Sequence, residues 1–375
     1  MKKIILHRIL LLAVLPLFLQ CGQKETKTPS MNTFYVGTYT QQESQGIYEY
    51  ILHENGQLEQ KGLVAKSDNP SFLAKSADGN FLLAVNEVNT KDSIGFVESF
   101  RIQKDSLILI DKESSGGAHP CHINLNTSGQ VLTANYTGGN MGLLQLMQDG
   151  SLSDLLDVQQ HFGNGGTERQ QGPHAHSAWF SPYNGDIISV DLGTNSLWFS
   201  RIDQEKKIFL PQAPPTLQLP QGAGPRHLVF HPTEEWIYVV NELSNTVTQL
   251  VKENDSTAYT ISAAQTTLPK DYTEPSFCAD IRISADGKFV YVSNRGHNSI
   301  AIFAVDQKTG ALEVVGHEAT RGDHPRNFSL SPDGRYLLVA NQNTNNIVSF
   351  KRDKNTGLLE YADTVDAPTP VCILF

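Results

Sequence analysis

Residues 324–341 read HPRNFSLSPDGRYLLVAN, and this stretch contains the signals that decide the fold. A short apolar run follows Pro325 and leads into the turn Pro332-Asp333-Gly334. A second apolar run, Tyr336–Asn341, then ends at a polar residue. Asp-Gly supplies the positive φ that a tight hairpin turn needs. The stretch therefore predicts two antiparallel strands joined by a tight turn.

The same arrangement recurs along the chain with a period of about 50 residues, which is the length of one propeller blade. Prolines precede the apolar runs at Pro70, Pro120, Pro173, Pro225, Pro275, Pro325 and Pro370. A third strand is often predicted after the hairpin, for example at Ser299–Val305. Short strands at this period, without comparable stretches of helical periodicity, are typical of four-stranded blades arranged around an axis. We therefore predict an all-β, seven-bladed β-propeller.

The two ends of the chain are predicted to share the seventh blade. Pro370–Phe375 has the pattern of a first strand, and Phe34–Tyr39 has the pattern of the second strand that should follow it. Pairing the N- and C-terminal strands in one sheet closes the ring and removes its open edges. The predicted organisation is a signal peptide at residues 1–20, a polar tether at 21–31 and the propeller at 32–375.

The N-terminal segment is predicted to direct the chain to the cell envelope. Basic residues precede Ile9–Phe18, an apolar run that is too short to span a bilayer comfortably. Cys21-Gly22 follows and predicts a lipoprotein with the lipid on Cys21, so that membrane contact is made only through this anchor. Phe18-Leu19-Gln20 departs from the small residues usual before such a cysteine, and ordinary cleavage nearby stays open.

Composition excludes several classes of partner. The 375 residues carry a net charge of −10 and no block of Lys or Arg, which argues against nucleic acid. Beyond Cys21 the chain has only Cys121, Cys278 and Cys372, without a close pair. This pattern is neither a disulfide framework nor a zinc motif, so we predict buried cysteines and no metal.

Polar residues are predicted to converge at one mouth of the central channel. Residues after each proline and residues at each polar stop lie at the same end of the propeller, because the two strands are antiparallel. If the first strand is innermost, these positions surround the channel, and they include His174, His176, Arg226, Arg326, Glu87, Asn135, Glu242 and Arg295. Arginines suit a planar anionic group bound through two hydrogen bonds. We therefore predict a small anionic ligand.

Structural roles remain open for several of these residues. The repeated Asn at strand ends can serve as hydrogen-bonding links within a blade. Arg226 and Glu242 come from successive strands of one hairpin, so an ion pair that only stabilises the blade is an alternative. His174 and His176 alternate along a strand and are predicted on one face. Metal binding by this pair would need a third ligand, which the spacing does not indicate.

The chain resembles the lactonase family of seven-bladed propellers, which includes propeller-type 6-phosphogluconolactonase and the fungal 3-carboxy-cis,cis-muconate lactonizing enzyme. The matching strings, in chain order, are YVGTYT (35–40), NPS (69–71), ANY (134–136), PHAHS (173–177), GPRH (224–227), VNEL (240–243), SNRG (293–296) and HPRNF (324–328). The resemblance implies lactone chemistry without a cofactor, with His176, Arg226, Glu242 and Arg295 as catalytic residues. We expect His174, Glu87, Asn135 and Arg326 to contact the substrate.

The expected function is hydrolysis of a sugar lactone, either 6-phospho-glucono-1,5-lactone or a related aldonolactone, with Glu242 or His176 as general base. A signal sequence fits a phosphorylated substrate poorly, because such lactones are scarce outside the cytoplasm. Two alternatives stay open. One is a cycloisomerase that forms a lactone from a muconate-like dicarboxylate, and the other is a non-catalytic binding propeller at the envelope. The sequence does not indicate an oligomeric state.

Overall fold

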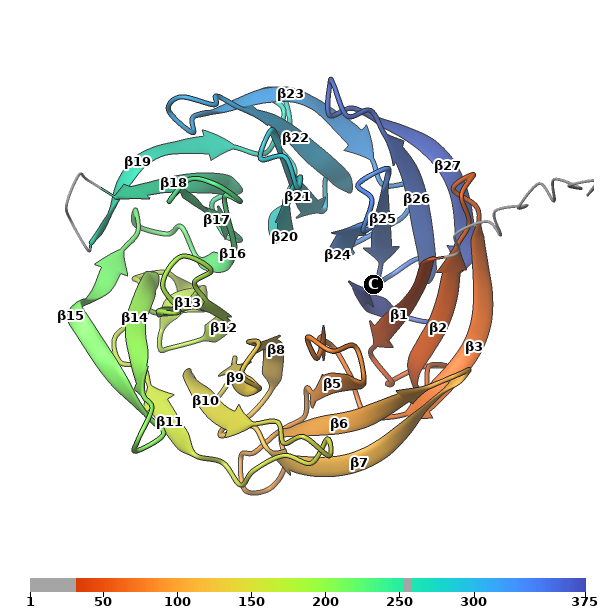
Figure 1. Cartoon of the computed structure of the whole chain (residues 1–375). Coiled ribbons are helices and arrows are strands. Elements are labelled where there is room, and N and C mark those ends of the chain that lie inside the picture. Colours follow the sequence, from red (N-terminus) through yellow and green to blue (C-terminus); the bar gives the residue numbers. More distant parts are fainter. Residues whose placement is uncertain (1–31, 253–257) are drawn as a thin grey trace, which may run out of the picture.

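The computed structural model describes residues 32–252 and 258–375, which form seven four-stranded antiparallel sheets around a central axis (Figure 1). The prediction of a seven-bladed propeller is confirmed. Within these ranges the only helical element is one short 3-10 turn, η1 (Glu168–Gln170), and no helix there is long and apolar enough to cross a membrane. The predicted signal peptide and the predicted tether at 21–31, with Cys21, lie outside the described residues.

The strands that begin at or near the repeated prolines lie closest to the axis, as predicted (Figure 1). These innermost strands are β4 (Leu73–Lys75), β8 (Pro120–Leu125), β12 (Ala175–Phe180), β16 (Pro225–Phe230), β20 (Phe277–Ile283), β24 (Pro325–Leu330) and β28 (Pro370–Leu374). The second strands are β1 (Asn32–Thr38), β5 (Phe81–Asn86), β9 (Gln130–Asn135), β13 (Ile187–Asp191), β17 (Ile237–Asn241), β21 (Phe289–Arg295) and β25 (Tyr336–Asn341). Every second strand from β5 onward is fully buried, which explains its unbroken apolar sequence.

The outer half of each blade is progressively more exposed. The third strands are β2 (Gly46–Leu52), β6 (Phe96–Gln103), β10 (Asn140–Gln145), β14 (Ser196–Asp203), β18 (Thr246–Lys252), β22 (Ser299–Val305) and β26 (Asn346–Arg352). The outermost strands are β3 (Leu58–Lys66), β7 (Ser106–Ser114), β11 (Asp157–Gln160), β15 (Ile208–Gln218), β19 (Tyr259–Thr266), β23 (Leu312–Ala319) and β27 (Leu359–Asp366). The outermost strands mix polar and apolar residues because one face and one edge meet solvent.

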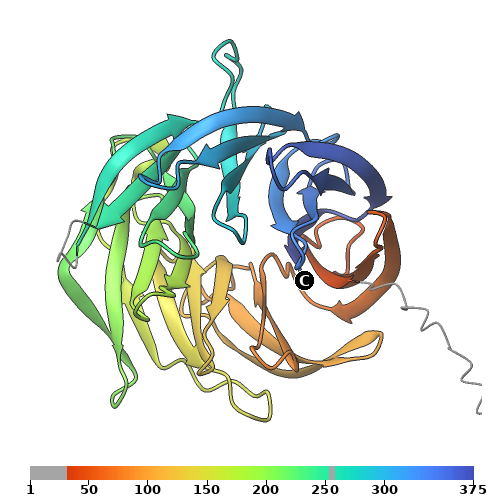
Figure 2. The same cartoon turned by 45° about the horizontal axis from the view of Figure 1, so that its top comes forward.

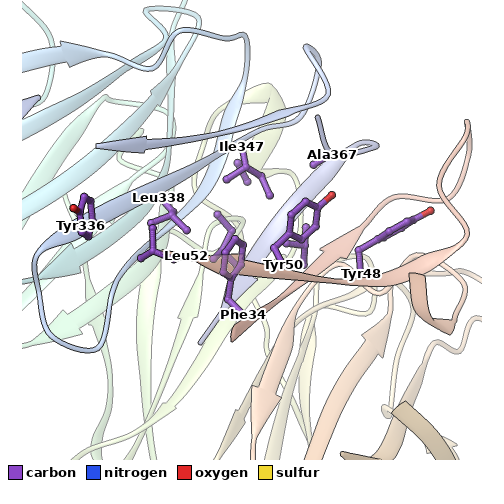
Figure 3. Packing of buried hydrophobic residues seen from close by; sticks show 11 residues of the cluster. Phe34, Tyr48, Tyr50, Leu52, Tyr336, Leu338, Ile347 and Ala367 are labelled. Carbon is purple, nitrogen blue, oxygen red and sulfur yellow. The ribbon is translucent and has the colours of Figure 1, made fainter. Parts of the chain in front are cut away.

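The seventh blade joins both ends of the chain, as the sequence predicts. Its strand order is β28-β1-β2-β3, and Val36 pairs with Ile373 across the β1–β28 ladder. Figures 1 and 2 show the N-terminal strands beside the C-terminal strand. Phe34, Tyr50 and Leu338 belong to the apolar cluster between this blade and its neighbour (Figure 3). The ring is therefore closed by antiparallel pairing and by shared apolar packing.

Ile373 offers a test of this closure, because its side chain is buried in the same cluster. Ile373→Ala is expected to lower the free energy of unfolding by about 3 kcal/mol, as for other large-to-small changes in a core. Val315, on the outermost strand β23, is 40% exposed, and Val315→Ala should change it by less than about 0.5 kcal/mol. Chemical denaturation of both variants measures the difference, and equal losses would contradict closure by this strand.

A β-bulge recurs at the start of four innermost strands. In each, the first residue of the innermost strand pairs with the last residue of the second strand. The residue after it has no partner on the second strand. The residues left out are Cys121, His176, Arg226 and Arg326. Bulges re-aim side chains and are common beside active sites. The local backbone thus turns three predicted site residues away from ordinary strand positions.

Candidate active site

Glu242 lies at the centre of an arginine cluster that three separate segments build. It directly follows β17, and its Oε2 accepts a hydrogen bond from Arg226 Nε on β16 at 3.1 Å and forms an ion pair with Arg295 on β21 at 2.9 Å. Its Oε1 is 3.2 Å from an Arg169 nitrogen in the loop before β12. Glu242, Arg226 and Arg295 are all buried, whereas Arg169 is half exposed. The structure therefore brings together three of the four predicted catalytic residues.

The electrostatics of this arginine cluster are dominated by positive charge. Burial raises the pKa of Glu242, but the charges of Arg295, Arg226 and Arg169 outweigh burial and lower its pKa to about 2. Burial, together with the charges of Arg295 and Arg326, lowers the pKa of Arg226 to about 10. The arginine charges contribute to both shifts, because buried guanidinium groups outnumber the carboxylates that face them, and burial is the first cause of the Arg226 shift. A cluster of this kind favours an incoming anion.

Arg226 is further held by groups from the next blade. Its NH1 donates to the carbonyl of Ala279 and lies 3.3 Å from His227 Nε2. The other ring nitrogen of His227 contacts Asp280 Oδ1 at 2.9 Å. Asp280 is fully buried and also contacts Asn327 and Arg282. This network fixes the guanidinium direction, so Arg226 is positioned before any ligand arrives.

His176, the fourth predicted catalytic residue, is buried beside the cluster. Its Nδ1 lies 3.7 Å from Cys121 Sγ, and its ring meets that of His227 edge-on with centroids 5.3 Å apart. Burial and the charge of Arg226 lower its pKa well below the ordinary value for histidine. No carboxylate pairs with His176 among the residues that the structure describes. The imidazole is therefore neutral at pH 7 and can accept a proton.

His174 lies close to His176 but is engaged differently. Its ring stacks on Tyr136 with centroids 4.5 Å apart, and its Nδ1 contacts the Tyr136 carbonyl at 3.0 Å. His176 meets the same Tyr136 ring edge-on at 5.5 Å. Both imidazoles therefore contact one aromatic residue, and the hydroxyl of that residue accepts a hydrogen bond from Arg169.

Glu87 and Arg326 form a second polar group at the same mouth. The Tyr39 hydroxyl donates to Glu87 Oε2 at 2.8 Å and accepts from Arg326 NH2 at 2.7 Å. The positive charge of Arg326 also acts on Arg226 and Glu242. Glu87 is thus engaged by Tyr39, whereas Arg326 adds to the positive charge that the arginine cluster presents.

Asn135 is not brought to the arginine cluster. Its amide donates to the carbonyl of Ser115, in the connection before its blade, and to Asn140 Oδ1 on the next strand. Asn86 and Asn341 likewise donate to carbonyls in the connections before their blades, whereas Asn241 donates to Thr248 within its own blade. Asn135 therefore has the blade-linking geometry that the sequence left open as the alternative to substrate contact.

Sequence reasoning missed Arg169 as a site residue. It lies in η1, within the connection between β11 and β12, and nothing in the repeat has a counterpart to this segment. The only signal was the spacing from Pro120 to Pro173, which is slightly longer than most of the other intervals. Tyr39 was predicted as the end of a strand and not as a site residue, although its hydroxyl bridges Glu87 and Arg326.

The three cysteines beyond Cys21 are free and buried, as predicted. Burial raises the pKa of the Cys278 thiol to about 12, so it is protonated at neutral pH. Among the described residues, no three His, Cys, Asp or Glu side chains are grouped so that they could hold a metal ion.

Comparison with known proteins agrees with this geometry. The family described as "Lactonase, 7-bladed beta-propeller" matches residues 33–375. A 6-phosphogluconolactonase of Bacillus subtilis is 38% identical over 298 residues, which cover 78% of this chain and 83% of the relative. A 6-phosphogluconolactonase of Formosa agariphila is 34% identical over 306 residues, which cover 79% and 85%.

A solved structure gives the same result. The periplasmic gluconolactonase PpgL of Pseudomonas aeruginosa superposes with a TM-score of 0.86 at 30% sequence identity, covering 92% of this chain and 98% of that one. The family match at residues 33–375 spans all seven blades, from β1 to the end of β28. This chain belongs to the lactonase family of seven-bladed β-propellers.

Proposed function

We propose that this protein hydrolyses an anionic or polyhydroxylated sugar lactone, 6-phospho-glucono-1,5-lactone or a related aldonolactone. The observation that carries the proposal is the arginine cluster around Glu242, which holds more positive than negative charge in a buried setting. Hydrolysis of a lactone develops negative charge on the carbonyl oxygen and releases a carboxylate. A preorganised positive site stabilises both.

The relatives support this class of substrate. Two of them are named 6-phosphogluconolactonase and one structural relative is named a gluconolactonase. These names share an aldonolactone and differ in the phosphate group. The proposed substrate of this chain is accordingly an aldonolactone. Comparing rates with glucono-1,5-lactone and with its 6-phosphate shows whether the phosphate group is required.

In the proposed mechanism, a water molecule attacks the lactone carbonyl carbon while His176 accepts the proton. Arg226 and Arg295 stabilise the oxyanion of the tetrahedral intermediate. The bond between the carbonyl carbon and the ring oxygen then breaks, and the ring oxygen takes the proton back from His176. The product is the open-chain hydroxy acid, which releases its acid proton to solvent and leaves as a carboxylate, and no cofactor is consumed.

The two candidate bases are distinguished by their surroundings. Glu242 has a pKa of about 2, and each of its oxygens accepts a hydrogen bond from an arginine, so it is a weak base. His176 is neutral and lacks a carboxylate partner in the described part of the chain. An anionic ligand beside Arg226 would offset the part of the shift that the charge of Arg226 causes and would raise the pKa of His176, while the larger effect of burial would remain. We therefore propose that His176 is the general base and that Glu242 positions the arginines.

The proposed location is the cell envelope, with a lipid on Cys21. The apolar run before Cys21-Gly22 supports this, and one structural relative is named a periplasmic protein. Cys21→Ala should abolish labelling by a radioactive fatty acid and release the protein from the membrane fraction. Unchanged fractionation of Cys21→Ala would contradict the lipid anchor.

The test of the function is a pH-stat assay of the purified chain with glucono-1,5-lactone and its 6-phosphate. The rate above spontaneous hydrolysis is expected to be saturable with at least one of them and to be lost in Arg295→Met. A 3-carboxymuconate substrate, followed by ultraviolet absorbance, tests the cycloisomerase alternative. Absence of saturable hydrolysis of both lactones in a folded sample would overturn the proposal.

Arg169 is expected to contribute to substrate capture. It is half exposed at the mouth and donates to both Tyr136 and Glu242, so it can exchange one of these contacts for an anionic substrate. Arg169→Gln should raise KM about tenfold with little change in kcat, because one charge-assisted hydrogen bond is lost. Arg201→Gln is the control, since Arg201 is exposed and pairs with Asp186 at a hairpin turn. An unchanged KM for Arg169→Gln would exclude this role.

A further inference from the structure

A cavity of about 420 Å³ opens at the end of the channel opposite the arginine cluster. The innermost strands all run in the same direction along the channel, and Arg226 lies at the start of one of them, β16. The cavity is lined by later residues of these strands, including Lys75 on β4, Asn124 on β8, Arg282 on β20 and Ser329 on β24. Its position therefore differs from that of the site described above.

Aromatic rings separate the two ends of the channel. His122 packs against Phe72 and Trp179 with ring centroids 4.5 and 4.4 Å apart. His227, which contacts Arg226, lies 5.5 Å from His122 and 5.8 Å from Phe72 by the same measure. Phe72, His122 and Trp179 form the inner wall of the cavity. A molecule in the cavity would therefore contact this wall and not Glu242.

The charge of the cavity is unusual for this protein. Its lining contains two cationic side chains, Lys75 and Arg282, and no Asp or Glu, although the whole chain carries a net charge of −10. Arg282 is paired with Asp280 behind the wall. Lys75 forms no ion pair with a carboxylate among the described residues and lies 5.9 Å from the Tyr35 ring centroid. Lys75 therefore brings a positive charge without a carboxylate partner to a cavity whose lining is mostly aromatic and aliphatic.

His122 adds a second, independent feature. Its Nδ1 accepts a hydrogen bond from the Ala178 amide, so its Nε2 carries the proton of the neutral ring. Nε2 is buried and has no hydrogen-bond partner in the described part of the protein. Buried donors without a partner are uncommon because each is unfavourable by about 1–3 kcal/mol. This unpartnered donor lies within the wall of the cavity, so a polar atom of a ligand would reach it only if the wall rearranged.

We propose that this cavity binds a small organic anion that has an apolar ring. The anionic group would pair with Lys75, and the ring would pack against Phe72, Trp179 and the aliphatic side chains that line the rest of the cavity, such as Leu330. The volume is within the range of ordinary small-molecule sites. This site does not depend on the proposed lactonase activity, because it shares no residue with the arginine cluster.

The probe for the test is 8-anilinonaphthalene-1-sulfonate, whose fluorescence increases in apolar surroundings, with N-phenyl-1-naphthylamine as its uncharged analogue. Lys75→Met should weaken binding of the sulfonate about tenfold and leave the amine within about twofold, because only the ion pair is lost. Ser329→Trp, which fills the cavity, should weaken both dyes. Lys66→Met is the matched control, because Lys66 is exposed on the outermost strand β3.

Energy transfer from Trp179 provides an independent readout, since it lines the cavity. Trp179→Phe should reduce transfer to the bound sulfonate dye more than removal of Trp236, which packs in another blade interface. Equal affinity of the sulfonate dye for wild type, Lys75→Met and Ser329→Trp would overturn the proposal. Loss of binding in Arg295→Met would place the dye at the arginine cluster and would also overturn it. Failure of lactone hydrolysis would leave these titrations unaffected, so the two proposals fail separately.

Discussion

His176→Gln is expected to lower kcat about a thousandfold while the melting temperature changes little. Loss of a general base typically reduces the rate by about 10²–10⁴-fold. Among the described residues, the His176 side chain makes a long contact with Cys121 Sγ and ring contacts, so little stabilising hydrogen bonding is lost. Glutamine keeps a polar group of similar size at the bulge but cannot take a proton at neutral pH. Steady-state kinetics on a lactone, beside a thermal melt, measure both quantities.

His174→Gln is the matched control, because His174 lies two residues earlier and also contacts Tyr136. Its kcat should stay within about threefold of wild type, since its ring is engaged by stacking and by the Tyr136 carbonyl. The pH profile gives a further readout: the basic form of His176 should be required on the acidic limb of kcat/KM. A full-rate His176→Gln enzyme would remove His176 from the mechanism and return the assignment of the base to Glu242.

Glu242→Gln is expected to lower the free energy of unfolding by about 3 kcal/mol at pH 7. Removing one partner of a buried ion pair leaves uncompensated charge, here on Arg226 and Arg295. Phosphate at millimolar concentration should restore part of the loss, because an anion that binds the native arginine cluster stabilises it by mass action. Denaturant unfolding with and without phosphate measures this. Glu59→Gln, at an exposed pair with Lys61, is the control and should change little.

The same variant has a predicted pH signature. The pKa of Glu242 is about 2 in the folded protein, below the ordinary value of 4.5. A lowered folded pKa contributes stability that is fully present above the unfolded pKa and is lost as pH falls through the folded pKa. Wild type should therefore lose this contribution between about pH 5 and pH 2, and Glu242→Gln should lack that part of the acid dependence. Parallel curves for the two proteins would show that Glu242 is not held ionised by the arginines.

Much of the architecture could be predicted because it is written in local sequence. Asp333-Gly334 and its equivalents fix hairpin turns through backbone conformation, and apolar runs such as Tyr336–Asn341 form buried strands wherever they pair. The period of about 50 residues and the split first and second strands then determine seven blades and a closed ring. The convergence of Arg226, Glu242, Arg295 and His176 follows from this topology alone.

The chemistry of the mouth was decided only by tertiary structure. The approach of Arg169 from η1 has no signal in the repeat, and it places a third arginine on Glu242. Asn135 is the opposite case: its position in the repeat predicted substrate contact, but its amide donates to the carbonyl of Ser115. The physical reason is that hairpins depend on neighbouring residues, whereas ion pairing, burial and the resulting pKa values depend on atoms that meet across blades, where small differences in backbone register decide which charges come into contact.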